Sequence, residues 1–252
     1  MAHIPVDPAP WIEDLPRNER GFVVPAEAGW FEGRAILSKV ATDRKVALGM
    51  RRGCGVCGYP LAEGKPVYRA FAQGDAAQMR GYERERSHDP SGPLHLSCVL
   101  FSAMVCPYLR EKTARLSKSS EINPGGRRGG LAAVMGFEDY GLMVYPGQHR
   151  LLDAAFPVPA FAYLNLSEDI PYREGVELAD RYAAAVVEDE VLIDTSRPRL
   201  YWTDQPADLA KLQGALRADT KRLNRAEPDY EQHVIGEGRY VVYTQVISAA
   251  NA

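Results

Sequence analysis

The chain has 252 residues, of which 46% are hydrophobic and 25% are charged. This composition is typical of a globular protein and excludes a wholly disordered or fibrous chain. The net charge of −3 hides an uneven distribution. Residues 51–130 carry 13 Lys/Arg against 7 Asp/Glu, a balance of +6, whereas the rest carries 17 against 26, a balance of −9.

The first residues contain neither a basic stretch nor an apolar core of the kind found in secretory signals. No apolar run approaches the roughly 20 residues that a membrane-spanning helix needs. We therefore expect a cytoplasmic protein that does not enter a membrane, with its four cysteines reduced rather than paired in disulfides.

The first half of the chain divides by composition into an N-terminal arm and a cysteine-bearing segment. Residues 1–50 begin with four prolines in sixteen positions, which predicts an extended arm, and continue with short strands from residue 21. Residues 51–116 hold all four cysteines. A Gly/Arg/Ser-rich stretch over 117–130 predicts a surface loop or linker.

The second half, residues 131–252, predicts an α+β domain. Leu209, Leu212, Leu216 and Leu223 recur at helical spacing after Pro206, which predicts an amphipathic helix. A second helix is predicted over 177–187. Short apolar or aromatic runs predict strands at 141–145, 161–166, 191–193, 199–202 and 239–246. The fold class is therefore α+β, with a zinc-binding segment joined to a mixed α/β remainder.

The most informative motif is Cys54-Gly55-Val56-Cys57-Gly58. Two thiolates separated by two residues can bind one ion when the backbone between and after them turns tightly, and the glycines permit that turn. His95-Leu96-Ser97-Cys98 supplies a second pair. On a helix over 94–105, residues three apart share one face. Cys54, Cys57, His95 and Cys98 therefore predict a structural Zn²⁺ site with four protein ligands.

A knuckle, a hairpin and a helix that supplies two ligands make a treble-clef-like arrangement, for which residues 65–73 would form the hairpin. Cys106 is an alternative ligand to His95, although it lies eight residues beyond Cys98, about 12 Å along a continuous helix. Pro107 places the end of that helix at Cys106. Two alternatives to a metal site stay open, unrelated buried thiols and a redox pair.

The positive balance of residues 51–130 predicts a nucleic-acid-binding surface or, equally, a face that is neutralised by the acidic remainder of the chain. The candidate nucleic-acid-binding residues are Arg51, Arg52, Arg80, Arg84, Arg86, Arg127 and Arg128.

The dipeptide His88-Asp89 offers a candidate catalytic pair, as in metal-dependent nucleases, but a polar turn at Asp89-Pro90 is favoured, because no downstream partner motif is visible. No catalytic residue can be assigned from the sequence.

Four motifs together resemble an uncharacterised group of actinobacterial and phage proteins that share a CxxCG…HxxC…CP pattern. The motifs span Arg20–Pro25, Cys54–Leu61, Gly92–Cys98 and Cys106–Leu109. The resemblance covers residues 15–115, implies zinc binding and implies no activity. It also strengthens Cys106 as a candidate metal ligand, because this cysteine belongs to the shared pattern.

These observations predict a cytoplasmic zinc-binding protein that acts as a nucleic-acid- or protein-binding module. One alternative is a hydrolase or nuclease with a cleft beside the zinc segment. Another, which depends on the resemblance alone, is a phage-encoded host-interaction protein.

Overall fold

The computed structural model describes residues 6–81, 88–89, 91–118, 124–155, 158–225, 231–235 and 238–243. Helices are interspersed along the chain with strands that form two antiparallel sheets, so the predicted α+β class is confirmed. Within these ranges, no helix is both long and apolar enough to span a membrane.

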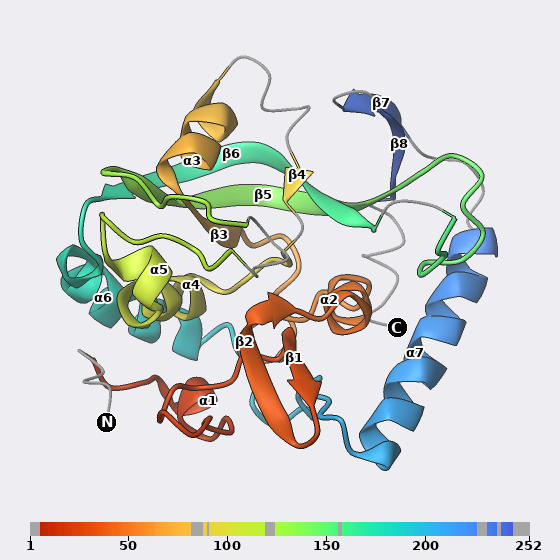
Figure 1. Cartoon of the computed structure of the whole chain (residues 1–252), viewed down its shortest axis with the longest axis horizontal. Helices are drawn as coiled ribbons and strands as arrows, with labels where there is room; N and C mark the ends of the chain where they lie inside the picture. Colours follow the sequence, from red (N-terminus) through yellow and green to blue (C-terminus); the bar gives the residue numbers. More distant parts are fainter. Residues whose placement is uncertain are drawn as a thin grey trace.

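Two long antiparallel strands, β5 (Ala132–Val144) and β6 (Ala160–Tyr172), run side by side across the left and centre of Figure 1 and form the centre of the main sheet. Nearly every side chain of β5 is buried, which is typical of a strand covered on both faces. The second half of β6 alternates between exposed and less exposed positions, as a strand with one solvated face does. The strands predicted at 141–145 and 161–166 lie largely within these longer ones.

The other strands of the main sheet come from distant parts of the chain. β3 (Val67–Phe71) pairs with β5, and β4 (His88–Asp89) pairs with β6. β8 (Gly238–Tyr243) pairs with β5, and β7 (Glu231–Ile235) pairs with β8. β3 is a single strand joined to β5, so the hairpin predicted over 65–73 is wrong. The edge-to-face contact of Phe71 with Phe137 stabilises the pairing that forms instead.

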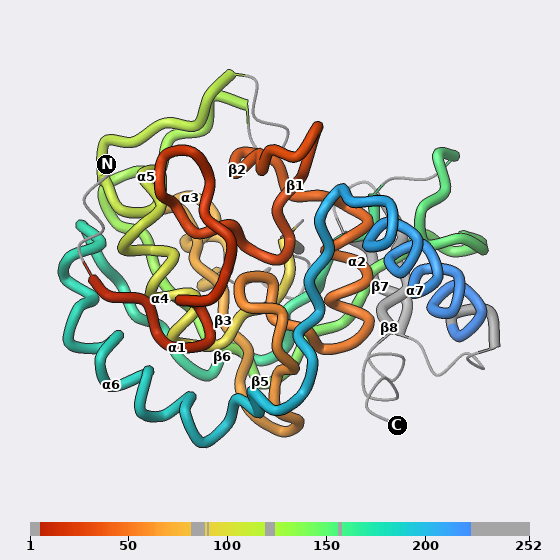
Figure 2. The backbone as a smooth tube through the Cα atoms, turned by 90° about the horizontal axis from the view of Figure 1, so that it is seen from below, coloured from red at the N-terminus to blue at the C-terminus, as the bar shows by residue number. Residues whose placement is uncertain are grey.

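A group of helices packs beneath the sheet in Figure 1, and α4 (Leu96–Val105) is at its centre. Nine of its ten residues are buried, so α4 is apolar on almost every side. Around it lie the N-terminal helix α1, the short helices α5 and η2, and α6, while α3 follows β3 (Figure 2). Their bounds are Pro10–Glu13, Pro107–Arg110, Gly175–Leu178, Ala179–Glu190 and Gln73–Arg80.

The remaining elements form a smaller layer beside the helices. β1 (Ala28–Phe31) and β2 (Arg34–Val40) make a two-stranded hairpin, followed by α2 (Thr42–Gly49). The sequence does not predict α2. Six of its eight residues are buried, so apolar and polar residues do not alternate with the period of an amphipathic helix. α2 packs against α7 (Pro206–Arg225), the helix that the leucine spacing predicts.

One hydrophobic core connects all three sequence segments. It contains Trp11 from the N-terminal arm, Leu100 from α4 and Phe137 from β5. The segments 51–116 and 131–252 thus share both a sheet and a core. The stretches at 191–193 and 199–202, predicted as strands, form no strand. The first stretch is a turn. In the second stretch, the N–H of Leu200 donates a hydrogen bond to the carbonyl of Gly58, which lies at the end of the Cys54–Gly58 motif.

A buried tyrosine joins the sheet to α2. The hydroxyl of Tyr140 donates a hydrogen bond of 2.7 Å to the carbonyl of Gly49, and the Tyr140 side chain is fully buried. Tyr140→Phe should lower the free energy of unfolding by about 1 kcal/mol, because one neutral hydrogen bond is lost while the ring is kept. Urea unfolding would measure this, with Tyr108→Phe at a half-buried site as a control that should change stability by less than about 0.5 kcal/mol.

Candidate metal centre

The first half of the site is the cysteine knuckle, Cys54–Gly58, which follows α2. The N–H of Gly58 donates to the carbonyl of Cys54 at 2.9 Å, and the N–H of Cys54 donates to the carbonyl of Tyr59 at 2.9 Å. Gly58 has a φ of +74°, in the left-handed region that glycine adopts without strain. The backbone therefore closes a tight turn that brings the two thiols to one side.

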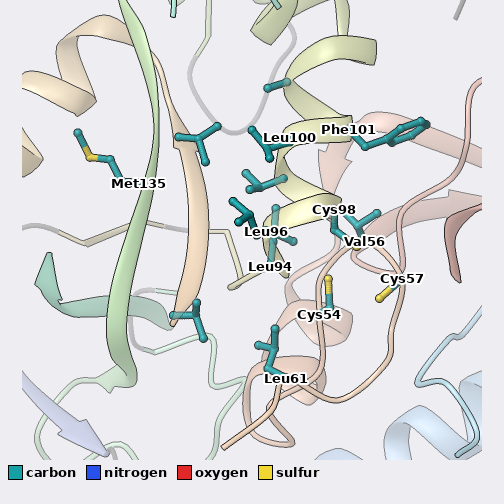
Figure 3. Close-up of a cluster of buried hydrophobic side chains, with 14 of the residues drawn as sticks. Cys54, Val56, Cys57, Leu61, Leu94, Leu96, Cys98, Leu100, Phe101 and Met135 are labelled. Carbon is teal, nitrogen blue, oxygen red and sulfur yellow. The ribbon is translucent and has the colours of Figure 1, made fainter. Parts of the chain in front are cut away.

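The second half comes from the beginning of α4. His95 is the N-cap residue of this helix, and Cys98 lies in its first turn. The predicted helix over 94–105 is therefore confirmed, with its first residue at Leu96. Figure 3 shows Cys54 and Cys57 directly beside the turn of α4 that carries Cys98.

The four ligand atoms of Cys54, Cys57, His95 and Cys98 lie within 4.8 Å of one another, and all four residues are buried. Ligands on one tetrahedral zinc lie roughly 4 Å apart, because Zn–S bonds are about 2.3 Å long. The four side chains thus form a Cys3His group that could hold a metal ion, as the spacing of the motifs predicts.

The imidazole of His95 is oriented by two contacts. Its Nε2–H donates to the carbonyl of Pro60 at 3.1 Å, which leaves Nδ1 facing the Sγ of Cys57 at 3.4 Å. Metal-binding histidines commonly donate their second ring nitrogen to a carbonyl in this way, which fixes the tautomer. Nδ1 is therefore the atom available for a metal.

The electrostatics of the group favour a cation among the thiols. Burial raises the pKa of Cys98, and the neighbouring Cys54 and Cys57 raise it further. Burial also raises the pKa of Cys54, but hydrogen bonds from Cys57 and Cys98 and the nearby His95 outweigh it and lower that pKa well below its usual range. An ionised Cys54 thus opposes the ionisation of Cys57 and Cys98, whereas a divalent ion would stabilise all three thiolates.

Cys106 is not among the four grouped residues. It ends α4 with an extended backbone (φ −67°, ψ 119°) and is partly exposed. The helix breaks only at Cys106, about two turns beyond Cys98, which is too late to bring this thiol back to Cys98. The group therefore contains His95 where the sequence left Cys106 as an alternative.

Comparisons with protein-family models, with curated proteins and with solved structures found no match to this chain. The chemistry of the site therefore has to follow from its own geometry.

Several arginines proposed to bind nucleic acid are paired with carboxylates of the same chain. Arg51 forms an ion pair with the fully buried Asp219. Arg52, itself 2% exposed, donates to Asp139 at 2.6 Å. Arg80 makes a bidentate contact with Asp169 at 2.5 and 2.8 Å. All three carboxylates come from the acidic residues 131–252, so the two unlike parts of the chain partly neutralise each other.

Arg128 is also buried and stacks on the ring of Tyr172, with 4.6 Å from the guanidinium carbon to the ring centroid. Arg127 is exposed. Arg84 and Arg86 lie outside the described residues. Among the described candidates, Arg80 and Arg127 are exposed, and Arg80 is paired with Asp169.

A buried group of charged side chains lies close to the knuckle, and the sequence did not reveal it. Glu27, Lys45, Arg69 and Asp89 interact electrostatically, although they come from four separate elements. No spacing pattern joins them, so only the three-dimensional structure brings them together. Asp89 belongs to the candidate pair His88-Asp89, whereas the side chain of His88 lies outside the described residues.

Burial lowers the pKa of Lys45 to about 8, although Glu27 and Asp89 oppose this shift. Between pH 8 and the ordinary lysine pKa of about 10.4, the unfolded chain binds more protons at this position, so stability should rise with pH. The stability difference between the wild type and Lys45→Met should therefore change by roughly 2 kcal/mol in favour of the wild type between pH 7 and pH 10. Denaturant unfolding at both pH values would measure it. Lys65→Met, at an exposed lysine, should show no such change.

Proposed function

We propose that this protein is a zinc-binding module in which Zn²⁺ is structural and which acts by binding nucleic acid or another protein. The observation that carries the proposal is the buried Cys3His group, whose four ligand atoms lie within 4.8 Å. Three thiolates and one imidazole are a typical structural zinc set, and softer sulfur ligands select against magnesium and calcium.

A structural role is supported by the number of ligands. Four protein ligands complete the tetrahedral coordination of zinc and leave no position for a water molecule or a substrate. The three cysteines of the group are fully buried, and His95 is 5% exposed. All four cysteines of the chain are free thiols, which supports a reducing, cytoplasmic location.

Elemental analysis of the purified protein tests the metal assignment. We expect one zinc per chain, and after replacement by Co²⁺ we expect the absorption of tetrahedral cobalt bound to thiolates. The Cys106→Ser protein should keep the full zinc content, whereas Cys57→Ser should lose it. A metal-free protein that is fully folded would contradict the proposal.

The salt dependence of binding distinguishes the two classes of partner. With Arg51, Arg52, Arg80 and Arg128 paired within the protein, the exposed basic residues that remain among the described positions of 51–130 include Lys65, Arg115, Lys118 and Arg127. Each neutralised phosphate changes the slope of log K against log salt by about −0.9, so a nucleic-acid partner that contacts these four residues should give a slope of about −4. Fluorescence anisotropy with a labelled duplex would measure it. A slope near −6 would mean that the paired arginines open, and no binding at low salt would favour a protein partner.

A hydrolase is the second candidate, and one observation favours it. Asp89 and Glu27, two carboxylates, line one cavity that is also bordered by Val56 of the knuckle. Loss of hydrolytic activity in Asp89→Asn, with unchanged zinc content, would support this candidate. Unchanged activity would remove it.

A further inference from the structure

A cavity of about 860 Å³ lies between the β1–β2 hairpin and the N-terminal segment on one side and β3, α4 and α5 on the other. This volume is within the range of about 300–1,000 Å³ that small-molecule sites occupy. Its walls are largely apolar and include aromatic and aliphatic side chains, among them Phe22, Trp30, Ile36, Leu94, Phe101 and Tyr108.

Three charged side chains meet at the wall of this cavity. Arg69 lies between two carboxylates, with Nη1 at 3.5 Å from Oε1 of Glu27 and Nε at 3.6 Å from Oδ1 of Asp89. Their side chains are 17%, 10% and 19% exposed, respectively. Since all three line the cavity, the surface that they retain is accessible to a molecule inside it.

The hydrogen-bonding capacity of this group is only partly used. Oε2 of Glu27 accepts from the N–H of Gly92 at 3.2 Å, and Oδ1 of Asp89 accepts from the N–H of Ser91 at 2.7 Å. A carboxylate offers about four acceptor positions, so both groups can accept more. The buried Nε of Arg69 makes no hydrogen bond among the described residues, although it lies 3.6 Å from Oδ1 of Asp89. The donor surface that Arg69 offers to the cavity belongs to the 17% of its side chain that stays exposed.

The charges limit what such a cavity can bind. An anion would meet the carboxylates of Glu27 and Asp89, while a cation would meet the guanidinium of Arg69. Acceptor positions of the two carboxylates and the donor groups of Arg69 lie side by side. Hydroxyl groups satisfy both, because each donates one hydrogen bond and accepts others.

We propose that this cavity binds a neutral polyhydroxylated ring, either a free sugar or the ribose of a nucleoside. Its hydroxyls donate to Glu27 and Asp89 and accept from Arg69, while its C–H face packs on the apolar wall. The site is separate from the metal centre, and nothing in this assignment requires that the ligand be hydrolysed.

The cysteine knuckle holds the polar end of the cavity in place. The N–H groups of Ala26 and Glu27 donate to the carbonyls of Val56 and Gly55, each at 2.9 Å. The N–H of Gly55 donates to the carbonyl of Pro93 at 3.1 Å. A Cβ atom at Gly55 would lie 2.7 Å from Oε2 of Glu27, so this glycine is needed for the close approach. A bound metal would therefore also order the ligand site.

Ligand-observed NMR and calorimetry on the zinc-loaded wild type test the proposal. The probes are glucose, galactose, mannose and N-acetylglucosamine for free sugars, uridine for a nucleoside, and inorganic phosphate and propylamine for charged ligands. We expect saturable binding of a sugar or of uridine, and the class that binds identifies the source. Binding of phosphate or propylamine alone, or of none of these probes, would overturn the proposal.

Isosteric variants locate the binding. Glu27→Gln and Asp89→Asn should each weaken the affinity about tenfold or more, because a hydrogen bond to a charged group is lost. Glu19→Gln is the matched control, since Glu19 also lines the cavity but its side chain is 77% exposed. An unchanged affinity in both isosteric variants, or an equal loss in Glu19→Gln, would contradict the assigned position.

Cys106 gives a readout that needs no variant. It lies on the cavity wall and is partly exposed, whereas the other three cysteines are fully buried in the metal group. A sugar or nucleoside that binds in the cavity should slow the labelling of Cys106 by a thiol reagent. Labelling at an unchanged rate under saturating ligand would place the binding elsewhere and overturn the proposal. Zinc content, measured in parallel, separates this result from any failure of the metal assignment.

Discussion

Chelation of the zinc that we propose for the Cys3His group should unfold this protein at neutral pH. Structural zinc sites contribute about 10–16 kcal/mol of apparent binding free energy in small zinc domains, and a whole domain is stable by only about 5–15 kcal/mol. Without the ion, three buried thiols and an imidazole converge with nothing to neutralise the thiolates. We expect circular dichroism to show loss of the native fold when a strong chelator is added, and recovery when Zn²⁺ is restored.

Cysteine variants make the same test specific. Cys98→Ser should reproduce the effect of chelation, because it removes a ligand from the first turn of α4 at the centre of the core. Cys106→Ser, eight residues along the chain and outside the group, should unfold at a temperature close to that of the wild type. Cooperative unfolding of Cys98→Ser at the wild-type temperature would show that the metal is dispensable for the fold.

Of the substitutions that add one methyl group to the knuckle, Gly58→Ala should lower the free energy of unfolding most. A Cβ atom there would lie 2.3 Å from the carbonyl oxygen of Leu200, which is backbone and cannot rotate away. The positive φ of Gly58 adds strain for any other residue. Strain and overpacking together should lower the free energy of unfolding by roughly 3–4 kcal/mol, measured by denaturant unfolding of the zinc-loaded protein.

Gly64→Ala separates the two contributions. Gly64 has a similar φ of +67°, but no atom lies within 4 Å of the position of its Cβ. The free energy of unfolding of this variant should therefore fall only by the contribution of backbone strain, about 1–2 kcal/mol. Equal losses in the two variants would mean that the contact with Leu200 relaxes without cost and that the knuckle is less rigid than its geometry indicates.

The metal group could be predicted from the sequence because its information is local. Cys54 and Cys57 are fixed by a five-residue turn, and His95 and Cys98 by one turn of helix. Steric and periodic rules are sufficient within each half. The two halves could then be joined, because one metal ion of known coordination geometry can bind the ligands of both.

The parts that could not be predicted depend on long-range pairing. β3 reads as half of a hairpin, but its partner β5 begins more than sixty residues later. The group of Glu27, Arg69 and Asp89 likewise joins three elements that no sequence period connects. Arg51 and Arg52 look free in the sequence, because the carboxylates that pair with them lie 168 and 87 positions away.

The pairing of arginines in the first half with carboxylates in the second affects how the protein should be dissected. A fragment ending near residue 130 would keep Arg51, Arg52 and Arg80 but would lack Asp219, Asp139 and Asp169. Such a fragment would display cationic groups that the intact chain covers, and polyanions would bind it without regard to sequence. Retention of this fragment on heparin or DNA would therefore result from the arginines that truncation exposes and would not be a property of the intact protein.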